Sequence, residues 1–402
     1  MFKDKKIVLI VTGGIAAYKA AVFVRLLIKA GAAVQVVMTA SAQEFVTEKT
    51  FAVLTKRPVL TDLFKETATG KVPHIELADW ADLMFVVPAT ANIISKIAQG
   101  IGDDVASTLL LARHTPLLVA PAMNENMYHN PAIQRNLDQL RADQVIILEP
   151  TYGMLAEGYA GMGRLPEPEV LFEQAEINLR QQQKTPLAGK NYLVTAGGTK
   201  EALDPVRFIG NRSSGKMGYA LAQALVEAGA QVTLISTVDL KAPWGVKVVT
   251  VQTAHEMEFA LEQRFDQSDG LVMAAAVADF RAAQVATQKI KKNNGQGLEL
   301  QLTQNPDLIA HFGAKKGHQK VIAFAAETND LITHAQAKLK KKNADLLIAN
   351  DVSKSDRGFG VDQNQVTLIE PGQPNVDLPL LSKIETARAI VKRIIQLTAR
   401  EN

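Results

Sequence analysis

The sequence contains no cysteine among its 402 residues. This absence excludes disulfide bonds, zinc sites with cysteine ligands and thiol nucleophiles. A long hydrophobic run is missing as well. The first apolar stretch, KIVLIVT, is far shorter than the roughly 20 residues that cross a membrane, and no signal-peptide cleavage pattern follows it. We therefore expect a cytoplasmic protein without a membrane partner.

A strong charge of either sign is also lacking. The 44 Lys and Arg residues nearly balance the 41 Asp and Glu residues, and the formal net charge is +3. This balance permits phosphate-bearing ligands but does not favour a nucleic-acid partner. The hydrophobic content of 47% and the charged content of 21% are ordinary for a globular protein, and the length predicts two or three domains of roughly 150 residues.

The chain repeats one pattern of strand, glycine turn, helix and strand. The first copy comprises strand Lys6–Thr12, helix Tyr18–Lys29 and strand Ala33–Met38. The second copy comprises strand Asn191–Thr195, helix Gly218–Ala228 and strand Gln231–Ser236. Further apolar strands are expected at Leu83–Val87, Leu117–Ala120, Val145–Leu148, Gly270–Ala274, Val321–Phe324 and Asp345–Ala349. The pattern predicts two doubly wound, Rossmann-like α/β domains.

The glutamine-rich stretch Glu173–Lys190 is interpreted as a helix followed by a linker. The predicted domains are accordingly residues 1–180 and 190–402, joined by a linker at 181–189. Ligands of such sheets bind beyond the carboxyl ends of the strands, so the residues that follow each strand are the candidates for a site.

In the first domain these residues are small or carry hydroxyl and amide groups. They are Gly14, Ile15, Ala16, Thr39, Ser41, Thr90 and Asn92. Backbone N–H groups at a helix start and nearby hydroxyls suit a phosphate group. Tight packing explains the glycine equally well, and helix capping is the alternative explanation for Thr90 and Asn92.

Three polar side chains of the first domain suit catalysis. His74 carries an imidazole that titrates near neutrality, although a lone histidine is usually structural. Asn124 follows a strand and offers both a donor and an acceptor without charge. Glu157 lies in the glycine-rich stretch LAEGYAGMGRLPEP. It is either a solvated acid of a surface loop or an acid held over an active site.

Three runs of the first domain resemble the flavin-dependent cysteine decarboxylases, over nearly all of residues 1–170. They are HIELADWADLMFVVPATANIISKIAQGIGDD, PAMNENMYHNP and GYAGMGRLPEP. More narrowly, they resemble the decarboxylase half of the bacterial bifunctional coenzyme A biosynthesis proteins. The resemblance implies a flavodoxin-like domain with FMN bound between the subunits of a trimer. It also implies that phosphopantothenoylcysteine is oxidised to a thioaldehyde, loses CO2, and is reduced to 4'-phosphopantetheine. His74 falls on the active-site histidine and Asn124 on the substrate-binding asparagine.

One position departs from that resemblance. The coenzyme A family usually has a cysteine where this chain has Glu157, and the cysteine donates the proton of the reductive step. Relatives without the cysteine release the oxidised enethiol. A Glu157 carboxyl desolvated under a closed lid would have a raised pKa and would donate the proton itself. Otherwise another donor serves or the reduction fails. We favour a competent enzyme, because the second domain resembles the enzyme of the preceding step.

The second domain contains GNRSSGKMG, which satisfies G-x-x-x-x-G-K. Met217 stands where a P-loop needs Ser or Thr to bind Mg²⁺, so a P-loop ATPase is excluded, while an anion-binding nest stays open. The lysines of KIKK, Lys289 to Lys292, form either a solvated face or part of a site. Lys338 and Lys342 have the i,i+4 spacing that places both on one face of a helix.

This domain resembles the phosphopantothenate–cysteine ligases over nearly all of residues 188–402. The resemblance rests on TAGGTKEALDPVRFIGNRSSGKMG, AAAVADF, KIKK, NPDL, FAAET and DLLIAND. It implies that CTP activates 4'-phosphopantothenate as an acyl-cytidylate, from which L-cysteine displaces CMP. The implied CTP site comprises Asp279, Lys289, Asn305, Pro306, Asp307, Leu308, Phe324, Lys338 and Lys342. Asp279 would also hold Mg²⁺ with CTP, Lys289 would stabilise triphosphate charge, and Asn211 would handle the acyl-cytidylate.

The resemblance further implies a homo-oligomer of decarboxylase trimers and ligase dimers, with a dodecamer as one possible form. Two other functions were weighed. An NAD(P)-dependent oxidoreductase is disfavoured because G-x-G-x-x-G is absent. A flavin-binding regulatory subunit without activity is disfavoured by the complete set of residues implied for CTP.

Overall fold

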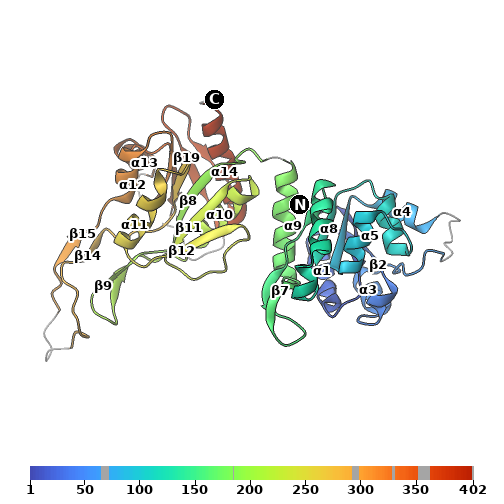
Figure 1. Cartoon of the computed structure of the whole chain (residues 1–402). Coiled ribbons are helices and arrows are strands. Elements are labelled where there is room, and N and C mark those ends of the chain that lie inside the picture. The colour runs from blue at the N-terminus through green and yellow to red at the C-terminus, as the bar shows by residue number, and fades with distance from the viewer. Residues whose placement is uncertain (65–71, 184, 292–297, 328–330, 352–362, 401–402) are drawn as a thin grey trace. The chain divides into compact units, whose positions relative to one another are not determined.

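The computed structural model divides the chain into two compact units, Met1–Leu179 and Arg180–Asn402 (Figure 1). It describes residues 1–64, 72–183, 185–291, 298–327, 331–351 and 363–400. The division falls within helix α9 (Pro168–Gln183), beside the predicted linker. The helix expected from Glu173 begins earlier than predicted, at Pro168, where the missing N–H of proline costs no helical hydrogen bond.

The N-terminal unit contains a parallel sheet of order β2-β1-β3-β4-β5. Its strands are β1 (Lys6–Val11), β2 (Ala33–Met38), β3 (Leu83–Ala89), β4 (Leu117–Pro121) and β5 (Ile146–Ile147). The order is that of flavodoxin-like folds, and the predicted α/β class is confirmed. The strands are apolar on both faces because helices cover both sides.

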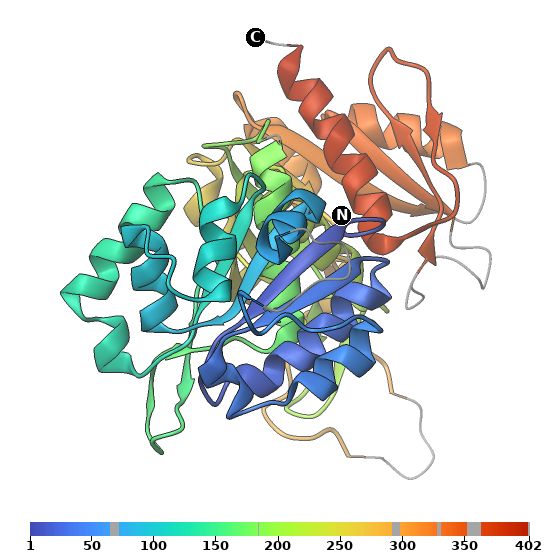
Figure 2. The same cartoon turned by 90° about the vertical axis from the view of Figure 1, so that its right-hand side faces the viewer.

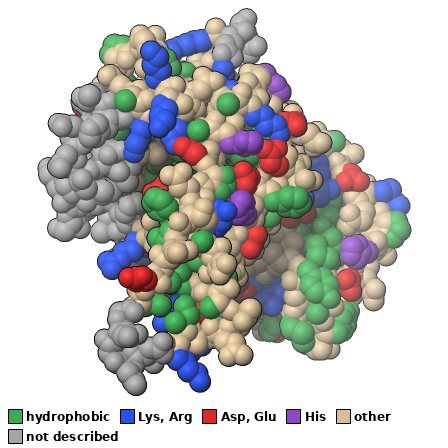
Figure 3. Space-filling model, turned by 90° about the vertical axis from the view of Figure 1, so that its left-hand side faces the viewer, with side chains coloured by type: hydrophobic (Ala, Val, Ile, Leu, Met, Phe, Trp, Pro, Cys, Tyr) green, Lys and Arg blue, Asp and Glu red, His purple; other side chains and the backbone are tan. Residues whose placement is uncertain are grey.

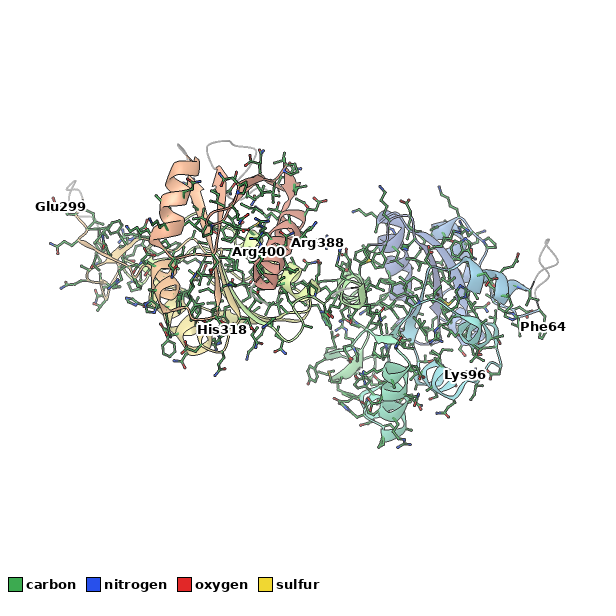
Figure 4. The ribbon with its side chains drawn as sticks, turned by 90° about the horizontal axis from the view of Figure 1, so that it is seen from above. Phe64, Lys96, Glu299, His318, Arg388 and Arg400 are labelled. Carbon is green, nitrogen blue, oxygen red and sulfur yellow. The ribbon has the colours of Figure 1, made fainter. Side chains whose placement is uncertain are left out.

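Its helices, besides α9, are α1 (Ala17–Lys29), α2 (Ala40–Gln43), α3 (Glu48–Thr55), α4 (Pro73–Trp80), α5 (Ala91–Gln99), α6 (Val105–Ala112), α7 (Glu125–Tyr128) and α8 (Pro131–Ala142). Helices α1, α3 and α9 pack on one face of the sheet, and α4, α5, α6 and α8 pack on the other (Figure 2). On this second face Lys96 of α5, labelled in Figure 4, lies 2.9 Å from Asp104, which caps α6. A separate antiparallel hairpin, β6 (Thr151–Met154) and β7 (Ala160–Arg164), carries the glycine-rich stretch.

The C-terminal unit contains an eight-stranded sheet of order β12-β11-β8-β13-β16-β17-β19-β20. The first six strands in this order are parallel to one another. Strand β19 pairs antiparallel with β17, and β20 pairs antiparallel with β19. These strands are β8 (Asn191–Ala196), β11 (Gln231–Ser236), β12 (Val246–Thr250), β13 (Gly270–Met273), β16 (Lys320–Glu327), β17 (Leu346–Asp351), β19 (Val366–Ile369) and β20 (Val376–Asp377). Three small sheets pair β9 (Lys200–Ala202) with β10 (Phe208–Gly210), β14 (Phe280–Ala282) with β15 (Leu302–Gln304), and β18 (Gln363–Asn364) with β21 (Leu381–Ser382).

The helices of this unit are α10 (Lys216–Glu227), α11 (Ala254–Phe265), α12 (Leu308–Lys315), α13 (Leu331–Lys341) and α14 (Lys383–Ala399). Helices α11, α12 and α13 cover one face of the sheet, and α10 packs with α14 on the other (Figure 1). The strands β14 and β15 begin an arm that extends away from the sheet (Figure 1). Basic, acidic and histidine side chains are interspersed on the face of this unit seen in Figure 3.

Ion pairs hold α14 in place. Arg388 donates two hydrogen bonds of 2.7 Å to the buried carboxylate of Glu227 on α10. Arg400 and Arg393 pair with the buried Glu370, and Figure 4 labels both Arg388 and Arg400. Breaking such a buried pair on one side would strongly destabilise this unit. Within the described parts of the chain, no helix is long and apolar enough to cross a membrane.

Candidate functional site

The turn after β1 meets the ends of β2 and β3. A Cβ atom added to Gly13 would lie 2.4 Å from Cβ of Ser41, so only glycine permits this approach. Gly14 lies beside Thr90, with 3.9 Å between the position of its missing Cβ and Cγ2 of Thr90. The structure therefore brings three of the segments selected from the sequence together at the carboxyl edge of the sheet.

Threonine hydroxyl groups form hydrogen bonds at the carboxyl edge of the sheet. Thr12 donates to the carbonyl oxygen of Pro88 at 2.7 Å and accepts from the N–H of Thr90 at 3.1 Å. Thr90 caps α5 and Thr39 caps α2 through their side chains. The capping explanation for Thr90 thus holds, but Asn92 is exposed and is not the cap. Thr12, which links β1 to β3, was missed because a threonine at a strand end carries no distinctive sequence signal.

The start of α1 leaves room for an anion. Gly14, Ile15 and Ala16 lead into α1, and Ala16 offers the helix no side-chain cap. Ile15 is 61% exposed. The N–H groups of Ala17 and Lys19 already donate to the carbonyls of Gly14 and Ala16, at 2.9 and 3.0 Å. The remaining uncapped N–H groups at this helix start fit the phosphate of a flavin nucleotide.

His74 is the second residue of α4. Its Nδ1 atom is buried and has no hydrogen-bond partner among the described residues. Such an atom is costly to leave unpaired, so a partner supplied by a ligand would fit here. In the described part of the chain no hydrogen bond joins His74 to Asn124 or Glu157.

Asn124 connects the start of α7 to the glycine-rich hairpin through its side-chain amide. Its Oδ1 accepts from the N–H of Asn126 at 2.9 Å and caps α7. Its Nδ2 donates to Oε1 of Glu157 at 3.1 Å and to the hydroxyl of Tyr159 at 2.7 Å. The structure therefore joins two residues that were selected separately from the sequence. Tyr159 was missed, although its place two residues after Glu157 in the same turn was a usable signal.

The hairpin that carries Glu157 is docked at its base. The N–H of Met162 donates to Glu125 at 3.1 Å, and the N–H of Met123 donates to the carbonyl of Gly163 at 3.0 Å. Gly163 has φ +112°, and an added Cβ would lie 2.3 Å from the carbonyl oxygen of Met123. Glu157 itself is exposed in the single chain, so the burial expected under a closed lid is not seen.

A buried lysine connects this hairpin to α1. Lys19 donates to the carbonyl of Leu165 and to Glu167, both at 2.9 Å. Arg164 also donates to Glu167, at 2.8 Å. The hydrogen bonds from Lys19 and then Arg164 hold the pKa of the Glu167 carboxyl below its usual range. The end of the hairpin is thus fixed relative to the helix whose start would face the flavin phosphate.

In the C-terminal unit the ends of β8 and β13 lie together. Thr199 accepts from the N–H of Ala278 at 2.9 Å. A Cβ added to Gly198 would lie 2.3 Å from the carbonyl oxygen of Asn211, which brings the loop before α10 against β8. Asn211 donates from Nδ2 to the carbonyl of Val277 at 3.0 Å.

Hydrogen bonds join residues of the implied CTP site in two separate places, Asn305 with Asp279 and Asp307 with Lys342. The N–H of Asn305 donates to the carbonyl of Asp279 at 2.8 Å, and its Nδ2 donates to the carbonyl of Ala278 at 2.8 Å. Asp307 caps α12 and pairs with Lys342. Burial acts to raise the pKa of Asp307, but the bonds from Lys342 and from the helix outweigh it, and the pKa is lowered.

The other residues of that set have different surroundings. Pro306 lies between Asn305 and Asp307, while Leu308 is buried as the first residue of α12. Phe324 is half-buried on β16. Lys342 follows the end of α13, but its N–H still bonds the carbonyl of Lys338 at 2.9 Å, so the predicted shared face is preserved.

Lys289 is not joined to this group by a hydrogen bond or ion pair within the described residues. It is exposed on the arm between β14 and β15. The backbone next to it is held by a clamp, the Asp204–Arg207 pair: Asp204 accepts from the N–H of Ile290 at 3.1 Å, and Arg207 donates to the carbonyl of Ile290 at 2.7 Å. Neither clamp residue carries a sequence signal that singles it out. Lys292 lies outside the described residues.

The Asp204 carboxylate is strongly stabilised. It accepts from Arg207 Nε at 2.9 Å and from the N–H of Val206 at 2.8 Å. The bonds from Arg207, followed by the backbone N–H groups, hold its pKa well below the usual range for aspartate. No group of three or more His, Asp or Glu side chains able to hold a metal occurs in the described ranges. Asp279 therefore fits Mg²⁺ only as one partner of an ion that a nucleotide also binds.

Both halves match known protein families. Residues 1–177 match the family described as Flavoprotein. Residues 187–397 match the DNA/pantothenate metabolism flavoprotein C-terminal domain. Two solved structures each resemble one half. The C-terminal domain of the coenzyme A biosynthesis bifunctional protein CoaBC covers 54% of this chain and 100% of its own, at 37% identity and a TM-score of 0.47. A PPC decarboxylase variant complexed with pantothenoylaminoethenethiol covers 45% of this chain and 100% of its own, at 29% identity and a TM-score of 0.40.

Full-length relatives extend over both halves. The coenzyme A biosynthesis bifunctional protein CoaBC of Bacillus subtilis is 45% identical over 400 residues, 99% of this chain and 98% of the relative. The protein of the same name from Mycobacterium tuberculosis is 43% identical over 409 residues, 98% of this chain and 97% of the relative. The chain therefore belongs to the family of bifunctional coenzyme A biosynthesis proteins, with a flavoprotein decarboxylase half followed by a ligase half.

Proposed function

We propose that the chain catalyses two consecutive reactions of coenzyme A biosynthesis. Residues 190–402 join 4'-phosphopantothenate to L-cysteine at the expense of CTP, and residues 1–180 decarboxylate the product to 4'-phosphopantetheine with FMN. The observation that carries this proposal is the 45% identity, over 98% of the relative's length, to a protein named as bifunctional in coenzyme A biosynthesis.

In the N-terminal half the flavin phosphate would lie against the start of α1. The residues that would hold FMN are Gly14, Ile15, Ala16, Thr39, Ser41, Thr90 and Asn92. Their support is the glycine turn packed against Ser41 and the uncapped start of α1. When bound, the flavin supplies the oxidation that makes decarboxylation possible and the hydride that completes the reduction.

The chain's own side chains would orient the substrate and move protons. The Asn124 amide would hold the substrate carboxylate by hydrogen bonds without a compensating charge, which leaves the carboxylate free to depart as CO2. His74 would act in proton transfer, because an imidazole changes charge near neutral pH. Glu157 stands where the family usually has a cysteine, and its hydrogen bond to Asn124 supports a role for this carboxyl group as the donor of the final proton.

In the C-terminal half, Asp279, Lys289, Asn305, Pro306, Asp307, Leu308, Phe324, Lys338 and Lys342 would bind CTP. Mg²⁺ held by the triphosphate and Asp279 would help pyrophosphate to leave. Lys289 would approach the triphosphate from the arm, because a flexible ammonium group neutralises phosphate charge.

Asn211 suits a role other than the one expected for it. The expected role in handling the acyl-cytidylate would use a donor for the developing oxyanion of the mixed anhydride. Its Nδ2 is instead directed at the carbonyls of Val277 and Ala276, at 3.0 and 3.5 Å. Its Oδ1 has no hydrogen-bond partner within the described residues, and an acceptor in this place would orient the amine of the incoming L-cysteine.

The test is mass spectrometry of the product that the purified, flavin-loaded protein forms from 4'-phosphopantothenate, L-cysteine, CTP and Mg²⁺. Phosphopantetheine is expected. Phosphopantothenoylcysteine as the end product would show that only the ligase half works, and a product lighter by two hydrogens would show that the reductive step fails. No product at all would overturn the proposal.

We also propose that the chain assembles as a homo-oligomer of decarboxylase trimers and ligase dimers, up to a dodecamer, in the cytoplasm. Exposed apolar side chains support contacts between copies: Ile15 before α1, Tyr18 on α1, and Phe208 and Phe280 in the C-terminal unit. Sedimentation velocity tests the assembly, and a monomer at micromolar concentration would contradict it.

A further inference from the structure

The amide of Asn124 is fully occupied in the free protein. Its oxygen accepts from Asn126, and its two N–H bonds are directed at Glu157 and Tyr159. The group that the proposed function assigns to the substrate carboxylate therefore already holds a carboxylate of the chain. Substrate and Glu157 cannot use the same N–H bond at once, and two neighbouring carboxylates repel each other.

The tip of the hairpin can leave Asn124 without disturbing the base. The turn closes on itself, through hydrogen bonds from Leu155 N–H to Tyr159 and from Gly158 N–H to Leu155 at 2.8 and 3.1 Å. The base is held separately by Met162 and Gly163. Among the described residues, the side-chain bonds between this tip and the rest of the unit are those from Asn124 to Glu157 and Tyr159.

We propose that Glu157 and the substrate carboxylate occupy the Asn124 amide in turn. This inference rests on the proposed decarboxylase function. Before binding, Glu157 holds the place of the substrate carboxylate, and the substrate displaces it. After CO2 has left, the amide is vacant again and Glu157 returns to it.

The return delivers an acid to the carbon that needs a proton. That carbon is the one that lost CO2, so it lies next to the position the carboxylate occupied. Glu157, protonated by solvent, keeps Oε1 on the Asn124 N–H and gives up its proton from Oε2. The O–H bond breaks and a C–H bond forms at the α-carbon, which turns the enethiolate into a thioaldehyde. The hydride that FMN would supply under the proposed function then gives the thiolate, and water reprotonates Glu157.

The exchange also sets the order of the steps. While the substrate carboxylate occupies Asn124, the acid is kept away from the α-carbon, and protonation follows decarboxylation. Tyr159 is a positioning residue in this scheme. Its hydroxyl accepts the second N–H of Asn124 at 2.7 Å and keeps the amide oriented for either carboxylate.

Calorimetric binding of two unreactive ligands to the full-length holoenzyme tests the exchange. The first is the serine analogue of phosphopantothenoylcysteine, whose hydroxyl cannot form a thioaldehyde, and the second is the same molecule without its carboxylate. In Glu157→Ala, affinity for the carboxylated ligand should rise about three- to tenfold, because a charge-assisted competitor is removed. Affinity for the second ligand should change less than twofold.

Glu157→Gln should raise the affinity for the carboxylated ligand less than Glu157→Ala does, since its amide oxygen is a neutral competitor for Asn124. Glu169→Gln, an exposed acid on α9, serves as the matched control and should change neither affinity. An equal change for both ligands, or weaker binding of the carboxylated one, would overturn the exchange. If wild type bound neither ligand, the proposed decarboxylase function would fail instead.

The reaction products show whether Glu157 donates the proton or only competes with the substrate carboxylate. With phosphopantothenoylcysteine as substrate, Glu157→Gln should accumulate a product lighter by two hydrogens, while Glu157→Cys should restore phosphopantetheine. Normal phosphopantetheine from Glu157→Gln at an unchanged rate would exclude Glu157 as the donor.

Discussion

Asn124 and Asn211 carry the same amide group but offer different atoms to a ligand. Asn124 directs its N–H bonds at a carboxylate. Asn211 donates its N–H bonds to backbone carbonyls, and its oxygen has no hydrogen-bond partner within the described residues. For a single residue, the neighbouring groups decide whether the donor or the acceptor of its amide stays available.

Substitution of Asn124 or His74 should affect decarboxylation alone. We expect Asn124→Ala and His74→Ala each to slow CO2 release at least about a hundredfold, because positioning and proton transfer are typically each worth that much or more. CTP-dependent pyrophosphate release should stay within twofold of wild type. Parallel assays of CO2 and pyrophosphate check this, and loss of ligation in either variant would contradict the assignment of these residues to the decarboxylase.

Lys289→Ala should show the opposite selectivity. Without the ammonium group the triphosphate loses a stabilising charge, and pyrophosphate release should fall about a hundredfold or more. Decarboxylation of added phosphopantothenoylcysteine should not change. Lys247→Ala, an exposed lysine on β12, is the control. Retained ligation in Lys289→Ala would remove this lysine from the CTP site.

At the scale of elements, both sites depend on projections anchored by a few contacts. The hairpin β6–β7 is docked through Glu125 and Gly163, and the arm after β14 is clamped by Asp204 and Arg207. A rigid sheet thus carries reactive groups on segments whose position rests on a few hydrogen bonds.

Gly163 and Gly158 form a matched pair in the hairpin. Both have positive φ, +112° and +86°, so Gly→Ala strains the backbone in both. A Cβ at Gly163 would also lie 2.3 Å from the Met123 carbonyl, whereas nothing lies within 4 Å at Gly158. Gly163→Ala should therefore undock β7 and lower decarboxylation about tenfold beyond Gly158→Ala. Equal effects in a CO2 assay would show that docking is not what matters.

The clamp makes the stability of the C-terminal unit depend on pH. The pKa of Asp204 is lowered in the folded state, chiefly by Arg207. The contribution of Asp204 to the free energy of unfolding is complete above its unfolded pKa, about 3.9. This contribution is lost as the pH falls through the lower folded pKa. Wild type should thus be more stable than Asp204→Asn at pH 6, and the difference should shrink below about pH 4.

Urea unfolding of both proteins at pH 6, 4 and 3 measures this difference. Asp204→Asn should also lower ligation several-fold, because the backbone next to Lys289 is released. A stability difference that grew as the pH fell would contradict the assignment of a charged Asp204.

At the scale of the whole molecule, the chain joins two units with separate cores. Leu9 is fully buried in the N-terminal core and Leu271 in the C-terminal one. Each Leu→Ala change should cost about 2–5 kcal/mol of unfolding free energy in its own unit. Calorimetry should show two transitions, of which each variant lowers one. A shift of both transitions by either variant would show that the units unfold as one.

The sequence by itself determined the fold class of both units and the segments that approach each site. Buried parallel strands read as continuous apolar runs, and ligands bind where those runs end, so both properties are local. The helix cap at Thr90 was likewise readable, since it depends on neighbouring residues alone.

Only the tertiary structure decided which side chains meet. The bond between Asn124 and Glu157 spans 33 positions, and the one between Asp204 and Ile290 spans 86. Neither separation matches the repeat of a helix or a strand, so neither contact can be predicted from the sequence. The path of the intervening loops sets the distance between the two residues. Within the described residues, Lys289 has no hydrogen bond to the other residues of the proposed CTP site, and the donor of Asn211 is directed at backbone carbonyls. Hydrogen bonds need a match of a few tenths of an ångström, and only the folded backbone supplies that precision.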